Sequence, residues 1–357
     1  MNGGRQPAFW TGLEDRLARA EQAGILANKL GPLGARSLRV RGAPVPPELE
    51  RAERLARSAW LVAIPLLGRI RSLVDGPLLL FKGPEAAMQY PDRARGFMDL
   101  DILCPHPHAV QAKLIDSGFI EVDDPEIFEQ EQHHLRPLQW PNLWVTVEIH
   151  QRPVWPHELD RLPPMEEIFV AAVPSATGLV GISAPKPAHH ALMLAAHGWT
   201  HQPLHSLRDV VDVAAISALA EPGEVEQVAT DWGIERLWRT TSTAAASLLG
   251  REQPSWAVRL WARHLPAVRE RTVLGNHMQR WLHGFWGLPL RGALARLRLN
   301  ARTALLPYPG EGWREKRVRA WNALTKPGAP MSVHAEKWRD GMDPEEDHLP
   351  HSASRGA

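Results

Sequence analysis

The sequence has a single cysteine, Cys104, among its 357 residues. One cysteine excludes an intramolecular disulfide and any zinc site built from several thiolates. The N-terminal residues lack the apolar core of a signal peptide, and no apolar run is long enough to span a bilayer. These absences predict a cytoplasmic protein.

The chain also lacks a large net charge. Its 41 basic and 40 acidic residues give a formal net charge of +1 at pH 7. The net charge therefore indicates no class of partner. The 44% of hydrophobic and 23% of charged residues are ordinary for a globular protein, and the length allows one large domain or two. The 32 prolines argue against a single long helical rod.

The first part of the chain has helical periodicity. It predicts a helix over residues 10–30, with Thr11 as its N-cap, and a second helix over roughly residues 47–74. A stretch rich in glycine and proline separates the two helices. We expect residues 1–74 to form an N-terminal helical segment.

The next part alternates between extended and helical patterns. A short apolar strand ends at Lys82-Gly83, a second strand covers residues 97–104, and an amphipathic helix then leads into a third strand. Extended segments on either side of Pro141-Asn142 predict a hairpin, since the second segment is apolar at every other position. This order predicts a small mixed sheet covered by helices over residues 75–180.

Only helical patterns follow from about residue 186 onward, which predicts a helical domain over residues 181–335. The polar composition of residues 336–357 predicts a disordered tail. The fold class that follows is α+β, with a small mixed β-sheet core flanked by helices and an all-helical C-terminal region.

The strand over residues 97–104 carries two aspartates, Asp99 and Asp101. Alternate side chains of a strand share a face, so both carboxylates point the same way, about 7 Å apart. A third carboxylate, Glu148, lies in the second arm of the hairpin. Desolvated carboxylates are costly unless something compensates them, and oxygen ligands on neighbouring strands suit a divalent cation. The alternative is a set of solvated carboxylates on a half-exposed sheet.

Two divalent ions on such carboxylates can activate an attacking oxygen and stabilise a leaving phosphate oxygen, which favours phosphoryl or nucleotidyl transfer. Lys82 and Gly83 suit the same chemistry, because a lysine supplies a point charge for a phosphate and a glycine lets the backbone approach it. Lys82 is equally compatible with an ordinary lysine at the end of a strand.

Six short segments occur in a characteristic order. They are LFKG at 80–83, YPDRARGFMDLDIL at 90–103, HHLRPL at 133–138, VEIH at 147–150, and LMLAAHGWTH with LHSLRDVVDV within 192–213. In their order and spacing they resemble the uncharacterised nucleotidyltransferase family of the DNA polymerase β-like nucleotidyltransferase superfamily, over roughly residues 75–215. The resemblance implies a nucleotidyltransferase core that transfers a nucleoside monophosphate from an NTP to a peptide, sugar or RNA acceptor and releases pyrophosphate.

The resemblance also implies roles for single residues. The carboxylates Asp99, Asp101 and Glu148 would be catalytic and would hold Mg²⁺ or Mn²⁺. The nucleotide would be bound by Lys82, Gly83, Arg95, His134, His150, His197, Arg208 and Asp209. Arg95 would either contact a phosphate or anchor its loop. The chain departs from the wider superfamily in having Lys-Gly instead of Gly-Gly or Gly-Ser after the first strand, and a glutamate as third carboxylate.

Other functions stay open at this point. A non-catalytic nucleotide-binding or antitoxin-like protein would keep the same fold, and the same metal site would also suit phosphoryl transfer. A metal phosphohydrolase of the His-Asp helical type needs an adjacent His-Asp pair, where this chain has Arg208-Asp209. Three histidines spaced by four resemble a zinc face, but Pro203 interrupts their helix. They are His197, His201 and His205.

Basic residues are concentrated near the C-terminus. Residues 255–321 contain 13 lysines and arginines against three glutamates and no aspartate, with tryptophans between them. Such a region suits an anionic partner, namely an RNA backbone, an acidic peptide or an anionic lipid. The other interpretation is a solvated helical face that acidic residues elsewhere balance.

Overall fold

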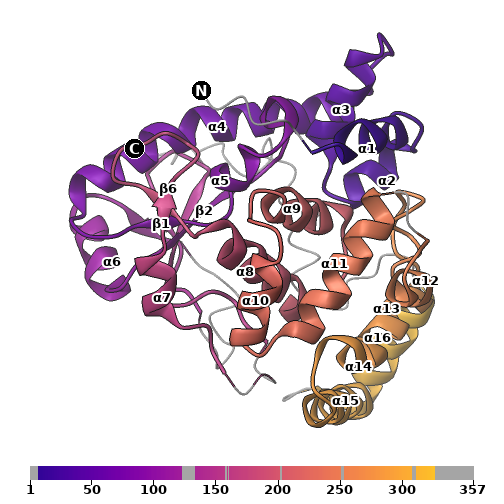
Figure 1. The fold of residues 1–357 in the computed structure, drawn as a ribbon. Coiled ribbons are helices and arrows are strands. Elements are labelled where there is room, and N and C mark those ends of the chain that lie inside the picture. The colour runs from indigo at the N-terminus through magenta and orange to yellow at the C-terminus, as the bar shows by residue number, and fades with distance from the viewer. Residues whose placement is uncertain are drawn as a thin grey trace, which may run out of the picture.

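The computed structural model of this chain describes residues 7–122, 133–156, 159, 161–201, 203–250, 253–307 and 311–325. Within these residues, short strands form one mixed sheet in the order β3-β4-β5-β2-β1-β7-β6. Figure 1 labels three of them, β1, β2 and β6. The strands are β1 (Leu79–Leu80), β2 (Asp99–Leu103), β3 (Ile120–Glu121), β4 (Leu138–Gln139), β5 (Thr146–His150), β6 (Val173–Pro174) and β7 (Ser183–Ala184).

Helices flank the sheet and form the described chain after β7. The helices up to β7 are α1 (Phe9–Leu17), α2 (Gln22–Ala27), α3 (Gly31–Val40), α4 (Pro47–Leu73), α5 (Pro84–Ala87), α6 (Pro107–Asp116) and α7 (Met165–Val170), with a 3₁₀ turn at Pro91–Arg93. The later helices are α8 (Pro187–His201), α9 (Leu207–Ser217), α10 (Glu224–Asp231), α11 (Glu235–Leu249), α12 (Trp256–Trp261), α13 (Val273–Leu282), α14 (Gly284–Gly287), α15 (Leu290–Leu305) and α16 (Trp313–Thr325). The predicted α+β fold class is confirmed.

The two longest strands lie at the centre of the sheet. β2 and β5 run parallel, with Asp101 opposite Glu148 and Asp99 opposite Thr146. β1 runs antiparallel to β2 on its other side, and β4 runs antiparallel to β5. The predicted hairpin around Pro141-Asn142 is therefore confirmed, whereas the sequence pattern did not reveal β6 and β7.

The two faces of the sheet pack against different helices. Leu100 and Val147 belong to a buried apolar cluster that also contains residues of α4 and α6. Strand alternation turns Asp101 and Glu148 to the opposite face. On that face Leu103 packs with apolar residues of α8 and α9, which lie between the sheet and α11 (Figure 1). The candidate carboxylates therefore face the helical part of the protein.

The N-terminal helices differ from the prediction in one respect. Instead of one helix over residues 10–30, α1 ends at Leu17 and α2 begins at Gln22, and Thr11 lies inside α1. A straight helix would turn Ile25 about 120° away from Leu13, whereas both side chains are buried in the same core. The break between α1 and α2 lets the side chains of Leu13 and Ile25 reach the same core. The helix over 47–74 is confirmed as α4, and α3 was missed.

One apolar core joins the N-terminal helices to the C-terminal ones, since Trp10 and Leu33 belong to the same buried cluster as Val210 and Leu237. The predicted divisions at residues 1–74, 75–180 and 181–335 stay predictions, and the tail 336–357 lies outside the described residues. Of the helices in the described ranges, none is both long and apolar enough to cross a membrane.

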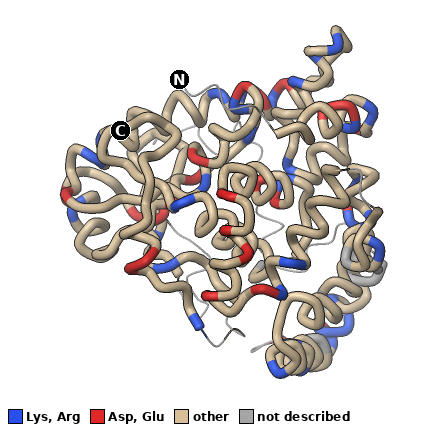
Figure 2. The backbone as a smooth tube through the Cα atoms, viewed as in Figure 1, with Lys and Arg blue, Asp and Glu red and all other residues tan. Residues whose placement is uncertain are grey.

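Lysine and arginine positions, blue in Figure 2, recur along the C-terminal helices α12 to α16. Trp256, Trp313 and Trp321 are exposed in the same region. The residues that make this region basic are thus combined with exposed aromatic side chains. An anionic partner for these helices stays a prediction.

Candidate active site

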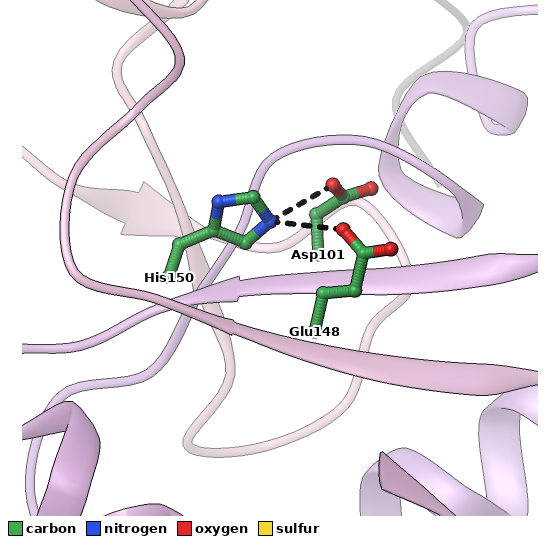
Figure 3. A group of neighbouring side chains, drawn as sticks. All are labelled: Asp101, Glu148 and His150. Atoms are coloured by element: carbon green, nitrogen blue, oxygen red, sulfur yellow. Dashed lines mark hydrogen bonds and ion pairs between the residues drawn. The ribbon is translucent and has the colours of Figure 1, made fainter. Parts of the chain in front are cut away.

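Asp101 and Glu148 lie side by side because β2 and β5 pair in register. Two residues after Glu148, on the same face of β5, lies His150. Ligand atoms of these three residues lie within 4.8 Å of one another, and Figure 3 shows both carboxylates turned toward the imidazole. Local sequence placed each carboxylate on a strand, and the strand pairing brings them together.

His150 Nε2 contacts both carboxylates, at 3.1 Å from Asp101 Oδ1 and 3.4 Å from Glu148 Oε2. The ring is fully buried. Burial by itself would lower the pKa of His150, but the hydrogen bonds to the two carboxylates outweigh it and raise the pKa. The two carboxylates therefore favour the protonated form of His150 when no other cation is bound there.

Lys82 supplies a second cation to Asp101. Its Nζ donates to Asp101 Oδ1 at 2.9 Å, and the Asp101 side chain has no exposed surface. Burial alone would raise the pKa of Asp101, yet the charges of Lys82 and His150 hold it well below its usual range. The same contact raises the pKa of Lys82 in spite of burial. Both groups are therefore charged at neutral pH.

Asp99 differs from the other two carboxylates. It is half-buried and lies opposite Thr146 instead of Glu148. Burial, and then the negative charges of Asp101 and Glu148, raise the pKa of Asp99 to about 7. Asp99 shares a strand face with Asp101 and responds to both charges, but its atoms do not belong to the group formed by Asp101, Glu148 and His150, so its catalytic role stays a prediction.

One buried oxygen in this site is not satisfied by the protein. Asp101 Oδ2 has no hydrogen-bond partner among the described residues, although it is inaccessible to solvent. An unpartnered buried carboxylate oxygen is costly, which makes it a natural ligand for a cation. Carboxylate oxygens are the donors that Mg²⁺ and Mn²⁺ prefer. Asp101 and Glu148, with His150 as the third group within reach, therefore fit a divalent ion, whereas a place for Asp99 among its ligands stays a prediction.

Gly83 forms the turn that carries Lys82 to Asp101. Its φ of 50° and ψ of −118° are accessible to glycine and not to residues with a Cβ. A Cβ at this position would meet the backbone oxygen of Asp99 at 2.7 Å, so the turn lies directly against β2. The Lys-Gly pair thus has a structural reason in addition to its predicted contact with phosphate.

Arg95 makes a buried two-point ion pair. Its Nε donates to Asp212 Oδ1 at 2.8 Å and its Nη2 donates to Asp212 Oδ2 at 2.7 Å. The hydroxyl of Tyr90 donates to Asp212 Oδ1 at 2.6 Å. These contacts tie the chain before β2 to α9, in line with the loop-anchoring alternative for Arg95. Its contact with a phosphate stays a prediction.

The predicted histidines lie in two places. His134 pairs with His150 through an isolated β-bridge, and their ring centroids lie 5.4 Å apart. His197 lies half-buried on α8. Because α8 ends at His201 and His205 precedes α9, the histidines spaced by four do not share one helix. Nucleotide binding by His134 and His197 stays a prediction.

Arg208 and Asp209 lie in the first turn of α9, where Ser206 Oγ accepts a hydrogen bond from Asp209 N. Arg208 Nε lies 3.7 Å from Asp209 Oδ1. The charge of Arg208 lowers the pKa of Lys29, which the negative charges of Asp209 and Asp99 oppose. Lys29 therefore links this turn of α9 to the carboxylates of β2 electrostatically.

Sequence reasoning missed several residues around the site. The imidazole of His190 on α8 donates through Nε2 to the backbone oxygen of Phe81 and so fixes the end of β1 against the helices. Asp212 had a signal, because it is an acidic residue within the apolar run of α9. Tyr90 begins the segment 90–103 on which the resemblance rests, but its contact with Asp212 joins segments far apart in the sequence. Lys29 had no signal, since the charges that act on it are also far away in the sequence.

No curated protein and no solved structure matches the chain. A family does match, over residues 15–250, which is more than half of the chain and contains all the site residues described above. The chain therefore belongs to the family described as uncharacterised nucleotidyltransferase.

Proposed function

We propose that this protein is a metal-dependent nucleotidyltransferase that moves a nucleoside monophosphate from an NTP to an acceptor and releases pyrophosphate. Family membership supports the reaction class. The observation that carries the proposal is the pairing of Asp101 with Glu148 in register, with Asp101 Oδ2 buried and unpartnered within the described chain. A peptide, a sugar or an RNA is the acceptor.

In this reaction an acceptor oxygen forms a bond to the α-phosphorus of the NTP. The bond from the α-phosphorus to the bridging oxygen breaks, pyrophosphate leaves with that electron pair, and the acceptor proton passes to a base. Mg²⁺ or Mn²⁺ held by Asp99, Asp101 and Glu148 would neutralise the triphosphate and polarise the reacting oxygens. Of the three carboxylates, Asp99 is the one whose pKa is raised. A bound cation would therefore stabilise the charged form of Asp99 most.

Other groups of the chain position the reactants. Lys82 is partly exposed at the turn after β1, where its amino group is available to a phosphate oxygen as well as to Asp101. His150 orients both carboxylates, because its Nε2 contacts an oxygen of Asp101 and an oxygen of Glu148. The backbone at Gly83 leaves room for a phosphate, since glycine has no side chain.

Two other functions share this site. Phosphoryl transfer would use the same carboxylates but would release a nucleoside diphosphate. A non-catalytic nucleotide-binding or antitoxin-like protein would bind the NTP without turnover. The complete set of Asp99, Asp101 and Glu148 favours an enzyme over the non-catalytic alternative, because nucleotide binding alone does not need three carboxylates.

The first experiment measures binding of the four NTPs by calorimetry, with and without Mg²⁺. We expect one NTP to bind the wild type only with the metal and not to bind Asp101→Asn. Asp116→Asn is the matched control, because Asp116 is an exposed aspartate on α6. Absence of NTP binding by the wild type, or equal binding by Asp101→Asn, contradicts the proposal.

The second experiment separates the reactions with a bound NTP labelled at either the α- or the γ-phosphate. Candidate acceptors are a peptide, a sugar and an RNA with a free 3′ end. Transfer of the α-label with release of pyrophosphate supports nucleotidyl transfer. Transfer of the γ-phosphate label would contradict nucleotidyl transfer and identify the reaction as phosphoryl transfer.

A further inference from the structure

A cavity of about 510 Å³ lies between α3, α4 and the 3₁₀ turn Pro91–Arg93 that precedes β2. This volume falls within the range of about 300–1,000 Å³ that is typical of small-ligand sites. The carboxylates of β2 and β5 do not line the cavity. It is therefore a second candidate site, distinct from the one that those carboxylates form.

Apolar side chains form much of the cavity wall. Val40 at the end of α3 and Leu61 on α4 are 68% and 73% exposed. Trp60 precedes Leu61 on α4 and is half-buried, and Pro32 and Ala94 also line the cavity. Large apolar side chains that stay exposed around a cavity indicate a ligand with an apolar part.

One cation of the cavity wall, Arg93, has no carboxylate partner. Its Cζ lies 4.7 Å from the centroid of the Trp60 ring. Its exposed guanidinium forms no ion pair or hydrogen bond with any residue that the structure describes. A cation–π contact leaves the N–H groups available, and a guanidinium donates two parallel hydrogen bonds to a carboxylate. Arg93 is therefore ready to bind an anionic group in the cavity.

Two other arginines of the wall share one carboxylate. Arg39 donates to both oxygens of Glu53, at 2.6 and 2.7 Å, and Arg57 donates to the same carboxylate at 2.8 Å. Glu50 also attracts Arg39, but it is itself paired with Arg54. The carboxylate of Glu53 thus neutralises one of the two arginine charges.

The fourth arginine of the wall, Arg36, has two acidic partners. Its Nε donates to Asp92 Oδ2 at 2.8 Å, and its Nη1 donates to Glu14 Oε1. The four arginines of the wall therefore face three carboxylates, when Glu14 behind the wall is counted with the two that line it. The cavity has one positive charge in excess, and Arg93 is the arginine without a carboxylate. A ligand with a single negative charge matches this balance.

Phe97 connects the cavity with the candidate active site. The rings of Trp60 and Phe97 pack edge to face, with their centroids 6.4 Å apart. A Cβ at Gly83 would lie 3.7 Å from Phe97 Cδ2, so Phe97 packs against the turn that carries Lys82 to Asp101. One aromatic side chain therefore separates the cavity wall from that turn. A few residues of an extended peptide, at about 3.3 Å each, are long enough to span such a separation.

We propose that this cavity binds the apolar, carboxylate-bearing end of a peptide acceptor. The carboxylate accepts from the N–H groups of Arg93, and an apolar side chain lies against Trp60, Leu61 and Val40. A sugar has too little apolar surface for such a wall, and an RNA carries one charge per nucleotide where the cavity has one charge in excess. Binding in the cavity stands on these contacts alone, whereas the role of the peptide as acceptor rests on the proposed function.

The test compares two probes that differ in one charge, N-acetyl-leucyl-phenylalanine and its C-terminal amide. Ligand-observed NMR measures their Kd without nucleotide or metal. We expect the wild type to bind the acid about tenfold more tightly than the amide, as for one hydrogen-bonded contact between charged groups. Arg93→Gln should bind the acid as weakly as the amide and should leave amide binding unchanged. Glutamine and arginine both have a Cβ, so the strain of the φ of 57° at this position is the same in the variant.

Arg69→Gln is the matched control. Arg69 is an exposed arginine of the same helix α4, its Cζ lies 4.0 Å from the centroid of the Trp140 ring, and it does not line the cavity. This variant loses the same charge and the same kind of ring contact, and it should keep both Kd values. Leu61→Glu, within the wall, should weaken binding of both probes. Equal binding of acid and amide by the wild type, or an unchanged preference for the acid in Arg93→Gln, overturns the proposal.

Two competitors test the identity of the ligand. If 4-phenylbutyrate, an apolar acid without a peptide bond, binds as tightly as the dipeptide acid, the cavity takes a free acid and the peptide assignment is wrong. Displacement of the dipeptide acid by a short oligoribonucleotide would assign the cavity to RNA and also overturn the proposal.

Asp101→Asn separates this proposal from the proposed function. The variant should lose metal-dependent NTP binding and should keep the tenfold preference for the dipeptide acid over its amide. If the wild type shows that preference but binds no NTP, the cavity remains a binding site and the proposed nucleotidyl transfer is contradicted.

Discussion

Arg95 and Asp212 are 117 residues apart in the sequence and form a buried ion pair with two parallel hydrogen bonds, of 2.8 and 2.7 Å. Both side chains are about 5% exposed. The pair joins the chain that enters β2 to the middle of α9. The position of α9 relative to the carboxylates of β2 therefore depends on this contact.

Replacing either partner alone should destabilise the fold strongly. Arg95→Ala or Asp212→Ala leaves the other charge buried and unpaired, which costs about 3–5 kcal/mol. Replacing both, as in Arg95→Met with Asp212→Leu, should cost less than either single change. Urea unfolding of the four proteins measures these free energies. Arg54→Ala is the control, because its ion pair with Glu50 on α4 is exposed and should contribute under about 1 kcal/mol.

Gly83→Ala should reduce activity as well as stability. The added Cβ would meet Asp99 O at 2.7 Å, and φ of 50° is strained for alanine, so the turn and β2 must shift. The strain alone costs on the order of 1–3 kcal/mol. Gly42→Ala is the control, since its φ is 67° but the space around it is open. It should lose stability without losing NTP binding. Equal NTP binding by the Gly83 variant would contradict the assigned role of this turn.

Stability should fall as the pH is lowered from about 6.5 toward 4. Burial lowers the pKa of His190 from 6.5 to about 4, so below pH 6.5 the unfolded chain binds a proton that the folded chain does not. The folded state loses on the order of 3 kcal/mol over this range from His190 alone. His205 and His264 act in the same direction.

Denaturant unfolding at a series of pH values measures this loss. His190→Gln keeps a donor for Phe81 O and cannot titrate, so its stability should depend less steeply on pH. His106→Gln, at an exposed position before α6, should follow the wild type. A His190→Gln profile parallel to that of the wild type would show that His190 is protonated normally in the folded protein.

Mg²⁺ or Mn²⁺ should raise the thermal midpoint of the wild type in the absence of any nucleotide. A ligand at a hundredfold excess over its Kd adds about 2.7 kcal/mol to the free energy of unfolding. Asp101→Asn should lose this effect, because it removes the buried carboxylate whose Oδ2 lacks a protein partner in the described chain. Asp116→Asn should keep it. Equal stabilisation of Asp101→Asn would place the ion elsewhere.

The sequence by itself determined the local parts of the site. Alternation of apolar residues with Asp99 and Asp101, and the same alternation around Glu148, predicted two strands with carboxylates on one face, because side-chain direction in a strand depends only on its period of two. The Lys82-Gly83 turn was visible as well, because a glycine at the end of a short apolar run indicates where a strand ends. The order of these motifs was enough to recognise the family and the fold class.

Only the tertiary structure decided which residues surround those carboxylates. The register of β2 with β5 puts Glu148 opposite Asp101 and leaves Asp99 opposite Thr146, and no local pattern fixes that register. Asp212 comes from α9, which contacts Arg95 before β2 only after the chain has folded. Partners of buried charges are chosen by proximity in space, so sequence periodicity, which reports direction within one element, cannot identify them.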